Sequence, residues 1–361
     1  MDRDALAAAG VRDLDRRAEL LSFLDEQGFT TADVIDAEAR GRLFALAGDV
    51  HVRSGPPRHS LRSAADELRL PVSDVAHAWS ALGLTVVDDE QLALSDADLA
   101  GLATWQTVRE LVGADVSLGL LRVLGAAVAR LAEAESAAMR AGVSELQLAV
   151  TEDEARTARA WAAIAPLVPR IGALMDAAHR QHLESARVYF EGVVLDTSAT
   201  VVCGVGFADL SGFTALTQTL PLDELSKLLS TFAGTVSEVV HAHSGRVVKL
   251  LGDAVMWVSA DATQLAEVAA HLVCHPLAAH AGIQVRAGLA FGPLLALDGD
   301  YFGAAVNLAA RLVATAEPGQ VLASAEVSKR LIGWTDEPLP PVMLRGFDEP
   351  VVPHSLRSPV G

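Results

Sequence analysis

The spacing of apolar residues changes character near residue 200, and this change constrains the fold more than any other feature of the sequence. Before that point, apolar residues recur every three or four positions, for example over residues 116–131, as on one face of a helix. After it, short β-rich runs alternate with longer helical patterns. We therefore expect an all-helical domain over residues 1–190, a linker over 191–199 and a mixed domain over 200–361.

The second half of the chain gives a definite order of elements. The expected elements are a strand at 201–209, a helix at 222–241, strands at 246–251 and 254–258, a helix at 261–279, a strand at 283–291, a helix at 303–314 and a strand at 320–323. Gly252 and Asp253 between two adjacent strands indicate a hairpin. The leading order, βαββαβ, is that of a ferredoxin-like core. We therefore predict an α+β fold, ferredoxin-like with additions, for this half.

The first half is divided by a polar segment, Ser54-Gly-Pro-Pro-Arg58. Residues 61–84 after it are expected to form two short helices, with Ser73 as the N-cap of the second. This pair resembles a helix-turn-helix, but a hairpin used for packing suits the sparse basic residues better. Further along, prolines 166 and 169 interrupt an Ala-rich helical pattern, and residues 171–188 are expected to form a helix that leads into the second domain.

Composition argues against a membrane-spanning chain and against a nucleic-acid partner. No run approaches the roughly 18 uninterrupted apolar residues that a spanning helix needs, and the first residues do not resemble a signal peptide. The formal net charge of −18 makes the chain a poor general binder of nucleic acid. Cys203 and Cys274 lie in apolar segments and are expected to be small core residues in a reducing compartment. A cytoplasmic setting follows.

Four short stretches of the second half carry the residues that suggest chemistry. They are Phe207-Ala-Asp-Leu-Ser-Gly-Phe-Thr214, Lys249-Leu-Leu-Gly-Asp-Ala254, Asp300-Tyr-Phe-Gly303 and Val306-Asn-Leu-Ala-Ala-Arg311. In the first, a strand ends in a carboxylate and a glycine turn, whose N–H groups can hold phosphates. The second places a carboxylate at a hairpin tip, and the last places Asn307 and Arg311 on one face of a helix. Each stretch is common alone, but the four in this order and spacing form a specific pattern.

Together these stretches resemble the catalytic domain of class III nucleotidyl cyclases over about residues 200–356. The segment Leu344-Arg-Gly-Phe-Asp-Glu-Pro350 is also similar to the final segment of that family. The resemblance implies that Asp209 and Asp253, with the Leu210 carbonyl, bind two divalent cations, Mg²⁺ or Mn²⁺. Two such cations can lower the pKa of the ribose 3′-hydroxyl, which attacks the α-phosphorus, and can neutralise the triphosphate.

The same resemblance assigns the contacts to the rest of the substrate. The residues whose backbone would bind the β- and γ-phosphates are Ser211, Gly212, Phe213 and Thr214. Arg311 would stabilise the charge that develops on the α-phosphate, and Asn307 would orient the ribose. In that family the metal-binding aspartates of one chain face the remaining site residues of a partner chain. Because this chain carries both sets, the resemblance implies a homodimer with two equivalent sites.

Lys249 and Asp300 are the residues that would select the base. Adenine has an acceptor at N1 and a donor at N6, which a lysine donor and an aspartate acceptor match. Lys249 is one of only three lysines among 28 basic residues, which favours a specific role over a solvated surface lysine. The resemblance therefore implies an adenylyl cyclase that converts ATP to cyclic AMP and pyrophosphate. A guanylyl cyclase is the alternative enzyme; the Gly-Gly-Asp/Glu-Glu-Phe signature of diguanylate cyclases does not occur.

The layout of the whole chain resembles soluble mycobacterial-type cyclases, in which a helical N-terminal domain restrains catalysis and responds to acid pH. Fatty acids are associated with that regulatory domain, and candidate wall or core residues here are Leu118, Leu121, Leu124, Val128 and Leu131. Histidine is the usual switch between about pH 5 and pH 8. His179 and His182, near the junction of the domains, are therefore candidate regulatory residues, with two solvated histidines as the alternative.

A rival interpretation of a different class is a helix-turn-helix regulator whose cyclase-like domain senses a nucleotide without turning it over. Its support is a basic face near Arg58, Arg62 and Arg69.

Overall fold

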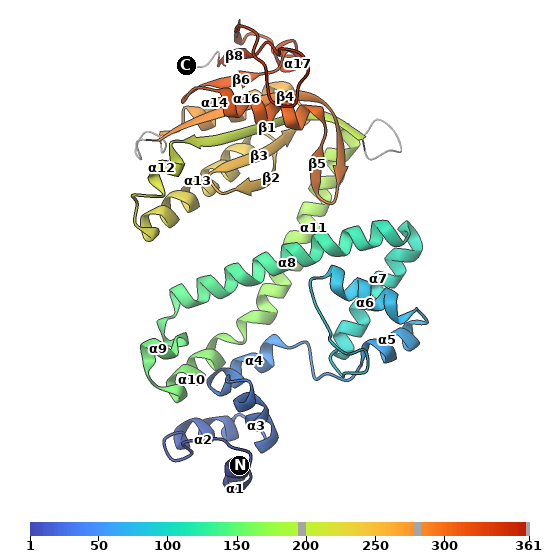
Figure 1. Ribbon diagram of the computed structural model, residues 1–361, viewed down its shortest axis with the longest axis vertical. Coiled ribbons are helices and arrows are strands. Elements are labelled where there is room, and N and C mark those ends of the chain that lie inside the picture. Colours follow the sequence, from blue (N-terminus) through green and yellow to red (C-terminus); the bar gives the residue numbers. More distant parts are fainter. Residues whose placement is uncertain (194–199, 277–282, 359–361) are drawn as a thin grey trace. The chain divides into compact units, whose positions relative to one another are not determined.

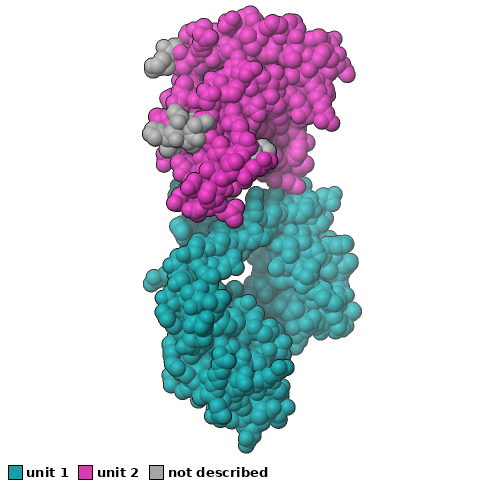
Figure 2. All heavy atoms as spheres, turned by 60° about the vertical axis from the view of Figure 1, so that its left-hand side comes forward, with its two compact units in different colours: residues 1–181 teal, residues 182–361 magenta. Residues whose placement is uncertain are grey.

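The computed structural model describes residues 1–193, 200–276 and 283–358 of the chain, drawn as a ribbon in Figure 1. The chain divides into two compact units, Met1–Gln181 and His182–Gly361, which Figure 2 distinguishes by colour. In the described part of the first unit, the secondary-structure elements are all helices apart from one isolated β-bridge between His59 and Leu94, whereas the second unit combines helices with a mixed sheet. This confirms the predicted succession of an all-helical region and an α+β region. In the described ranges, no helix has both the length and the apolar character that crossing a membrane requires.

The first unit is built around two apolar clusters. Its elements are α1 (Arg3–Ala8), α2 (Ala18–Glu26), α3 (Thr31–Ala39), η1 (Leu43–Ala45), α4 (Leu46–Val52), α5 (Leu61–Leu68), α6 (Val72–Ala81), α7 (Asp96–Val112), α8 (Ala114–Gly142), η2 (Ser144–Leu146), α9 (Leu148–Thr151), α10 (Glu154–Ile164) and the first part of α11 (Leu167–Val193), which continues into the second unit. One cluster joins α1 to α4 with α10, and the other joins α5 to α8. Thr30, Ser60 and Ser95 cap α3, α5 and α7, because each side chain accepts a hydrogen bond from the backbone N–H three residues later.

The predicted pair of short helices after the polar break is present as α5 and α6. The prediction of Ser73 as an N-cap is wrong, because α6 begins directly after Pro71 and no side chain caps it. Val75 and Ala78 of α6 are fully buried in the apolar cluster. Gly125 of α8 allows the end of this pair to approach closely, since an added Cβ would lie 2.5 Å from the Leu82 carbonyl oxygen.

The helix that leads into the second unit, α11, is longer than predicted. It includes residues 191–193 of the predicted linker, while residues 194–199 lie outside the described residues. The break predicted at Pro166 is confirmed, since it separates α10 from α11. The break predicted at Pro169 is wrong, because this residue lies in the first turn of α11. Backbone N–H groups in that turn have no intrahelical acceptor, so the turn accommodates proline.

The sheet of the second unit has a ferredoxin-like centre. Its elements are β1 (Thr200–Ser211), α12 (Phe213–Leu216), α13 (Leu222–Ala242), β2 (Arg246–Leu251), β3 (Ala254–Ser259), α14 (Ala262–Val273), β4 (Gln284–Leu297), β5 (Asp300–Phe302), α16 (Ala304–Thr315), β6 (Val321–Ala323), α17 (Ala325–Ser328), β7 (Thr335–Pro338) and β8 (His354–Arg357). The strand order is β2-β3-β1-β4-β6-β8-β7, with β5 paired to β4. The first four strands are antiparallel in the ferredoxin-like order, and the parallel β4–β6 pair makes the sheet mixed. The predicted fold class is confirmed.

Several elements of this unit were not predicted. Strand β4 continues to Leu297 instead of ending at residue 291, and it pairs with the short strand β5. Strands β7 and β8 have four residues each. Every residue of β7 is exposed, and β8 is too short to show the alternation that marks a half-buried strand. The second predicted helix, α14, ends at Val273 rather than extending toward residue 279, although residues 277–282 are not described.

The sheet is covered by helices on two faces, and glycines set how closely the helices approach. α13 and α14 pack on one face of the sheet, and α16 packs on the other. Alternate residues of β1 point toward α16 and form an apolar cluster with it. A Cβ added to Gly206 would lie 2.3 Å from the ring of Trp257, so this position admits the largest buried side chain. A Cβ added to Gly288 of β4 would lie 2.3 Å from the Val313 backbone nitrogen. The backbone of α16 therefore rests directly on β4.

Candidate active site

Two carboxylates meet where β1 approaches the β2–β3 hairpin. Asp209 lies near the end of β1, opposite Ala254 of β3, and Asp253 occupies the hairpin turn after Gly252, whose φ is 67°. The Leu210 N–H donates a hydrogen bond of 3.3 Å to the Asp253 carbonyl. Burial raises the pKa of the Asp253 carboxyl, and the neighbouring negative charge of Asp209 raises it further. Asp209 and Asp253 thus lie together, as the resemblance implied.

Arg286 of β4 is a third charged group at this place, and it was not predicted. It lies opposite Asp209 in the β1–β4 ladder, and its Nη2 and Nε donate to Asp209 Oδ2 over 2.7 and 3.1 Å. Its Nη1 also donates to the carbonyls of Ala314, in the last turn of α16, and of Ala316, the residue that caps it. Arg286 therefore fixes the Asp209 carboxylate and lowers the local negative charge.

The oxygen atoms here suit a divalent cation that completes its coordination with other ligands. In the described ranges, no group of three or more His, Cys, Asp or Glu side chains is arranged to hold a metal ion. Mg²⁺ is commonly held by one or two carboxylates while waters and substrate phosphates fill its other positions. The pair of Asp209 and Asp253, with the like-charge repulsion that raises the pKa of Asp253, fits that pattern.

The turn after β1 has the shape that the sequence indicated. β1 ends at Ser211, Gly212 takes the left-handed conformation with φ of 84°, and the short helix α12 follows. The Ser211 hydroxyl is buried and has no hydrogen-bond partner among the described residues. Phe213 packs against the core under α13, which fixes the turn. The side chain of Thr214 lies outside the described residues, although its backbone belongs to α12.

Lys249 and Asp300 come together from two separate strands. The Lys249 ammonium donates a hydrogen bond to the Asp300 carboxylate, and the two side chains are 34% and 28% exposed. Asp300 also accepts a hydrogen bond of 2.8 Å from the Tyr301 N–H. The pair therefore presents a positive donor and a negative acceptor side by side, partly open to solvent.

Asn307 and Arg311 lie on the exposed side of α16, opposite the buried Ala305 and Ala309. Arg311 Nε donates to the Arg345 carbonyl over 3.2 Å. Within the described part of the chain, neither side chain forms a hydrogen bond or ion pair with the two aspartates. One chain thus assembles the carboxylates, and separately the Lys249–Asp300 pair, and leaves the predicted catalytic helix face exposed.

The candidate regulatory residues lie in the helical parts. His179 and His182 are both exposed on α11, and their regulatory role stays a prediction. Of the candidate pocket residues, Leu121 is buried in the core, whereas Leu124 and Val128 are 49% and 40% exposed. Leu118 lines a groove of about 550 Å³ between α6 and α8. The fatty-acid site likewise stays a prediction.

Comparison with known proteins connects this geometry to a family. Residues 196–351 match the family described as the adenylate and guanylate cyclase catalytic domain. The uncharacterized protein Rv2212 of Mycobacterium tuberculosis (strain H37Rv) is 57% identical over 358 residues, which cover 99% of this chain and 95% of that protein. An adenylate cyclase of Streptomyces coelicolor is 31% identical over 288 residues, covering 78% of this chain and 73% of that enzyme.

Two further similarities concern proteins of the same kind. The pH-sensitive adenylate cyclase MT1302 of Mycobacterium tuberculosis is 28% identical over 341 residues, covering 91% of this chain and 83% of that enzyme. The crystal structure of the adenylyl cyclase CyaB from P. aeruginosa aligns with 44% of this chain and 96% of that chain, at 24% identity and a TM-score of 0.40. From the match over the residues that hold the site and from the similarity to the Streptomyces coelicolor enzyme, the chain belongs to the class III adenylate and guanylate cyclase family.

Proposed function

We propose that the protein is an adenylyl cyclase that converts ATP to 3′,5′-cyclic AMP and pyrophosphate in a homodimer. The observation that carries this proposal is the Lys249–Asp300 pair, in which a donor and an acceptor stand together and half-open to solvent. The lysine would donate to adenine N1 and the aspartate would accept from the 6-amino group. The names of the similar enzymes from Streptomyces coelicolor and Mycobacterium tuberculosis agree with this choice of base.

The reaction would take place beside the two aspartates. Asp209, Asp253 and the Leu210 carbonyl would hold two divalent cations, Mg²⁺ or Mn²⁺, which when bound supply acidification of the 3′-hydroxyl and neutralisation of the triphosphate. Arg286 holds the Asp209 carboxylate in one orientation through two hydrogen bonds. The buried Ser211 hydroxyl and the backbone of the turn after it would bind the β- and γ-phosphates.

The homodimer is supported by the exposure of Asn307 and Arg311. Both side chains lie on one exposed face of α16, and among the described residues neither forms a hydrogen bond or ion pair with Asp209 or Asp253. In a symmetric dimer, each chain would lend this face to the site of its partner, so that two equivalent sites form. Arg311 would then stabilise the charge on the α-phosphate and Asn307 would orient the ribose.

We expect the purified protein with Mn²⁺ to form cyclic AMP from ATP much faster than cyclic GMP from GTP at equal substrate. The double variant Lys249→Glu, Asp300→Cys is expected to lose most of this preference, because the donor and acceptor for adenine are both removed. Each missing hydrogen bond to a base typically changes discrimination by about tenfold or more. The measurement is kcat/KM for both nucleotides by product chromatography. Faster formation of cyclic GMP by the unaltered protein would contradict the assignment of the base and favour a guanylyl cyclase.

We also propose that the helical unit restrains the catalytic unit through α11 and responds to acid pH. His179 and His182 are exposed on this helix, and protonation would add positive charge close in sequence to Glu184. A fatty acid bound by the helical unit would act on the same restraint. Only a tenfold change in the balance between states, about 1.4 kcal/mol, is needed for a clear response.

The regulatory proposal predicts different pH profiles for the full chain and for a chain that starts at Asp196. Between about pH 5.5 and pH 8, the range in which histidine changes charge, the full chain is expected to show the steeper change in activity. Replacing both histidines with glutamine should flatten that profile toward the profile of the shorter chain. His77→Gln is the matched control, because His77 is an exposed histidine of α6 rather than of α11. This variant should leave the profile unchanged. Superimposable profiles of the full and shorter chains would contradict the proposal.

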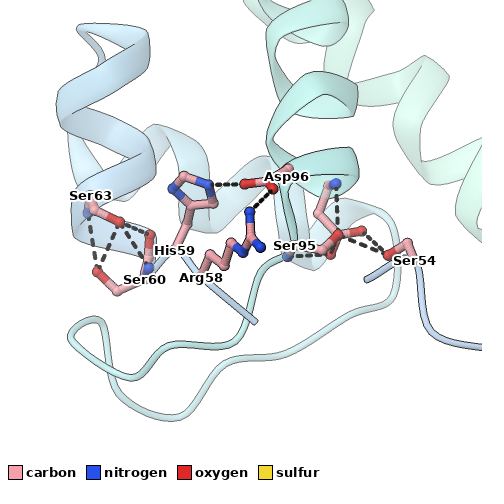
Figure 3. A network of polar contacts seen from close by, with 8 residues as sticks. Ser54, Arg58, His59, Ser60, Ser63, Ser95 and Asp96 are labelled. Carbon is pink, nitrogen blue, oxygen red and sulfur yellow. Dashed lines mark hydrogen bonds and ion pairs between the residues drawn. The ribbon is translucent and has the colours of Figure 1, made fainter. Parts of the chain in front are cut away.

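The rival interpretation as a helix-turn-helix regulator receives no support from the geometry of its basic face. Figure 3 shows Arg58 and His59 both directed at Asp96. Arg58 Nη1 lies 2.8 Å from Asp96 Oδ2, and His59 Nε2 lies 2.8 Å from Asp96 Oδ1. Arg62 similarly pairs with Glu90. Two of the three basic residues that would meet phosphates are thus paired with carboxylates of their own unit.

A further inference from the structure

Tyr189, near the end of α11, is anchored in the interior of the second unit. Its ring packs against the apolar cluster between the sheet and α16, and its hydroxyl is buried. The preceding residue, Val188, is 67% exposed. Burial, followed by the adjacent Cys203 and Tyr301 side chains, raises the pKa of the Tyr189 hydroxyl above its ordinary value. Tyr189 is therefore a neutral, partly buried contact between α11 and the strands, with its hydroxyl inside the unit.

Tyr189 contacts Arg246, which lies three residues before Lys249 in the same strand. The guanidinium of Arg246, the first residue of β2, lies 5.3 Å from the centroid of the Tyr189 ring. The ladder between β2 and β3 shifts register between Val247 and Lys249, because Val247 pairs with Trp257 and Lys249 pairs with Met256. Such an irregularity re-aims the side chains that follow it. The direction of Lys249 thus depends on how this bulged start of β2 is held, and Tyr189 is part of what holds it.

A second contact leads to Asp300. Tyr301 is 8% exposed and belongs to the same apolar cluster as Tyr189. It directly follows Asp300, and its N–H donates a 2.8 Å hydrogen bond to Asp300 Oδ1. Strand β5 has only three residues and pairs with β4 alone. Because so short a strand is weakly fixed by its ladder, the packing of Tyr301 contributes much of the placement of Asp300.

We propose that Tyr189 is a positioning residue that sets the spacing of Lys249 and Asp300, so that the end of α11 controls how tightly and how selectively the base is bound. This inference rests on the proposed function, since it takes the Lys249–Asp300 pair as the adenine-recognising group. Tyr189 touches Arg246, three residues before the lysine, and lies beside Tyr301, one residue after the aspartate. Loss of its ring would let β2 and β5 move apart independently. The base contacts would weaken, while the carboxylates near Asp209 would stay in place.

The test compares steady-state constants of full-length variants with ATP and with GTP. Tyr189→Leu is expected to raise KM for ATP about tenfold with kcat changed less than about threefold, the split expected when contacts made equally in ground and transition states are lost. The ratio of kcat/KM for ATP to that for GTP should fall by a similar factor. Tyr189→Phe keeps the ring beside Arg246 and should stay within about twofold of the unaltered protein. Val188→Ala, on the exposed side of the same turn, is the matched control and should change neither constant.

A double-mutant cycle separates this role from a general loss of stability. In a Lys249→Ala background the pair is already broken, so Tyr189→Leu should have little further effect on KM. If Tyr189→Leu folds poorly, Arg246→Met provides a second test, because it removes the cation beside the Tyr189 ring and leaves Tyr189 in place. Arg246→Met is expected to raise KM for ATP and to lower selectivity, as predicted for Tyr189→Leu. Independent, multiplying effects of Tyr189→Leu and Lys249→Ala would overturn the inference, as would an active protein whose KM and selectivity ignore Tyr189→Leu. An unaltered protein that forms no cyclic AMP would instead overturn the proposed function, and this inference with it.

Discussion

Replacing Asp209 or Asp253 with alanine is expected to reduce cyclic AMP formation by on the order of a thousandfold or more, because either change removes a carboxylate that, in the proposed mechanism, holds two cations at the reacting phosphate. The two side chains come from β1 and from the adjacent hairpin turn, and no other carboxylate described at this place could replace either of them. The measurement is turnover at saturating Mn²⁺ with size-exclusion analysis of each variant. A normal rate in either variant would contradict the metal assignment.

The raised pKa of Asp253 allows loss of activity to be distinguished from loss of folding in this experiment. Its folded-state pKa is raised by burial and by Asp209, so folding shifts this carboxyl toward protonation relative to the unfolded chain. Ionised Asp253 therefore destabilises the metal-free fold at pH values above its folded pKa, and this penalty disappears at pH values below its unfolded pKa. Asp253→Asn is consequently expected to abolish turnover without lowering the melting temperature at neutral pH. A large drop in melting temperature would mean that the carboxylate has a structural role that these contacts do not show.

Mixing Asp209→Ala chains with Arg311→Ala chains, each inactive alone, is expected to restore activity. In the mixed dimer one site collects both changes and the other keeps its two aspartates from one chain and Arg311 from the other. With random exchange, half of the dimers are mixed and each has one intact site of two, so about a quarter of the unaltered activity should return. The structural basis of this expectation is that Arg311 is exposed on α16 and, in the described part of the chain, forms no hydrogen bond or ion pair with Asp209.

The matched control for this mixing experiment combines Asp209→Ala chains with Asp253→Ala chains. Both changes fall in the same half of each site, so every site of the mixed dimer contains one of them and no activity should return. Exchange of chains is verified with two different affinity tags. Absence of restored activity in the first mixture, with exchange demonstrated, would place the complete site within one chain and would contradict the homodimer.

The parts of this molecule that could be predicted are those with a local signature. The βαββαβ order follows from runs of apolar residues, and the hairpin from Gly252-Asp253, so the ferredoxin-like centre was predictable. Arg286 was not, because it meets Asp209 only through the register of two strands whose residues are 77 positions apart. Nothing adjacent to Arg286 in the sequence distinguishes it from an arginine at a strand surface.

The resemblance and the local patterns contributed different things to the site. The pairing of Lys249 with Asp300, 51 residues away, came from the resemblance and not from spacing, and the structure brings the two together. Local rules failed where a neighbouring element decides the outcome. Pro169 is accommodated by its place in a first helical turn, and β7 owes its existence to pairing with β8 rather than to its own exposed residues.

The direct contact of α16 with β4 at Gly288 bears on how accurately an active site shared between two chains can be built. Such a site accumulates the positional errors of both chains, and most packing contacts add some error because side chains can change rotamer. At Gly288 the contact is backbone against backbone, since a Cβ would come within 2.4 Å of the Ala309 carbonyl oxygen. The distance between the sheet and α16, which carries Asn307 and Arg311, is thus fixed at Gly288, a residue without side-chain rotamers. In the proposed homodimer, the smallest residue in the chain would therefore set the positional tolerance of the half-site that α16 contributes.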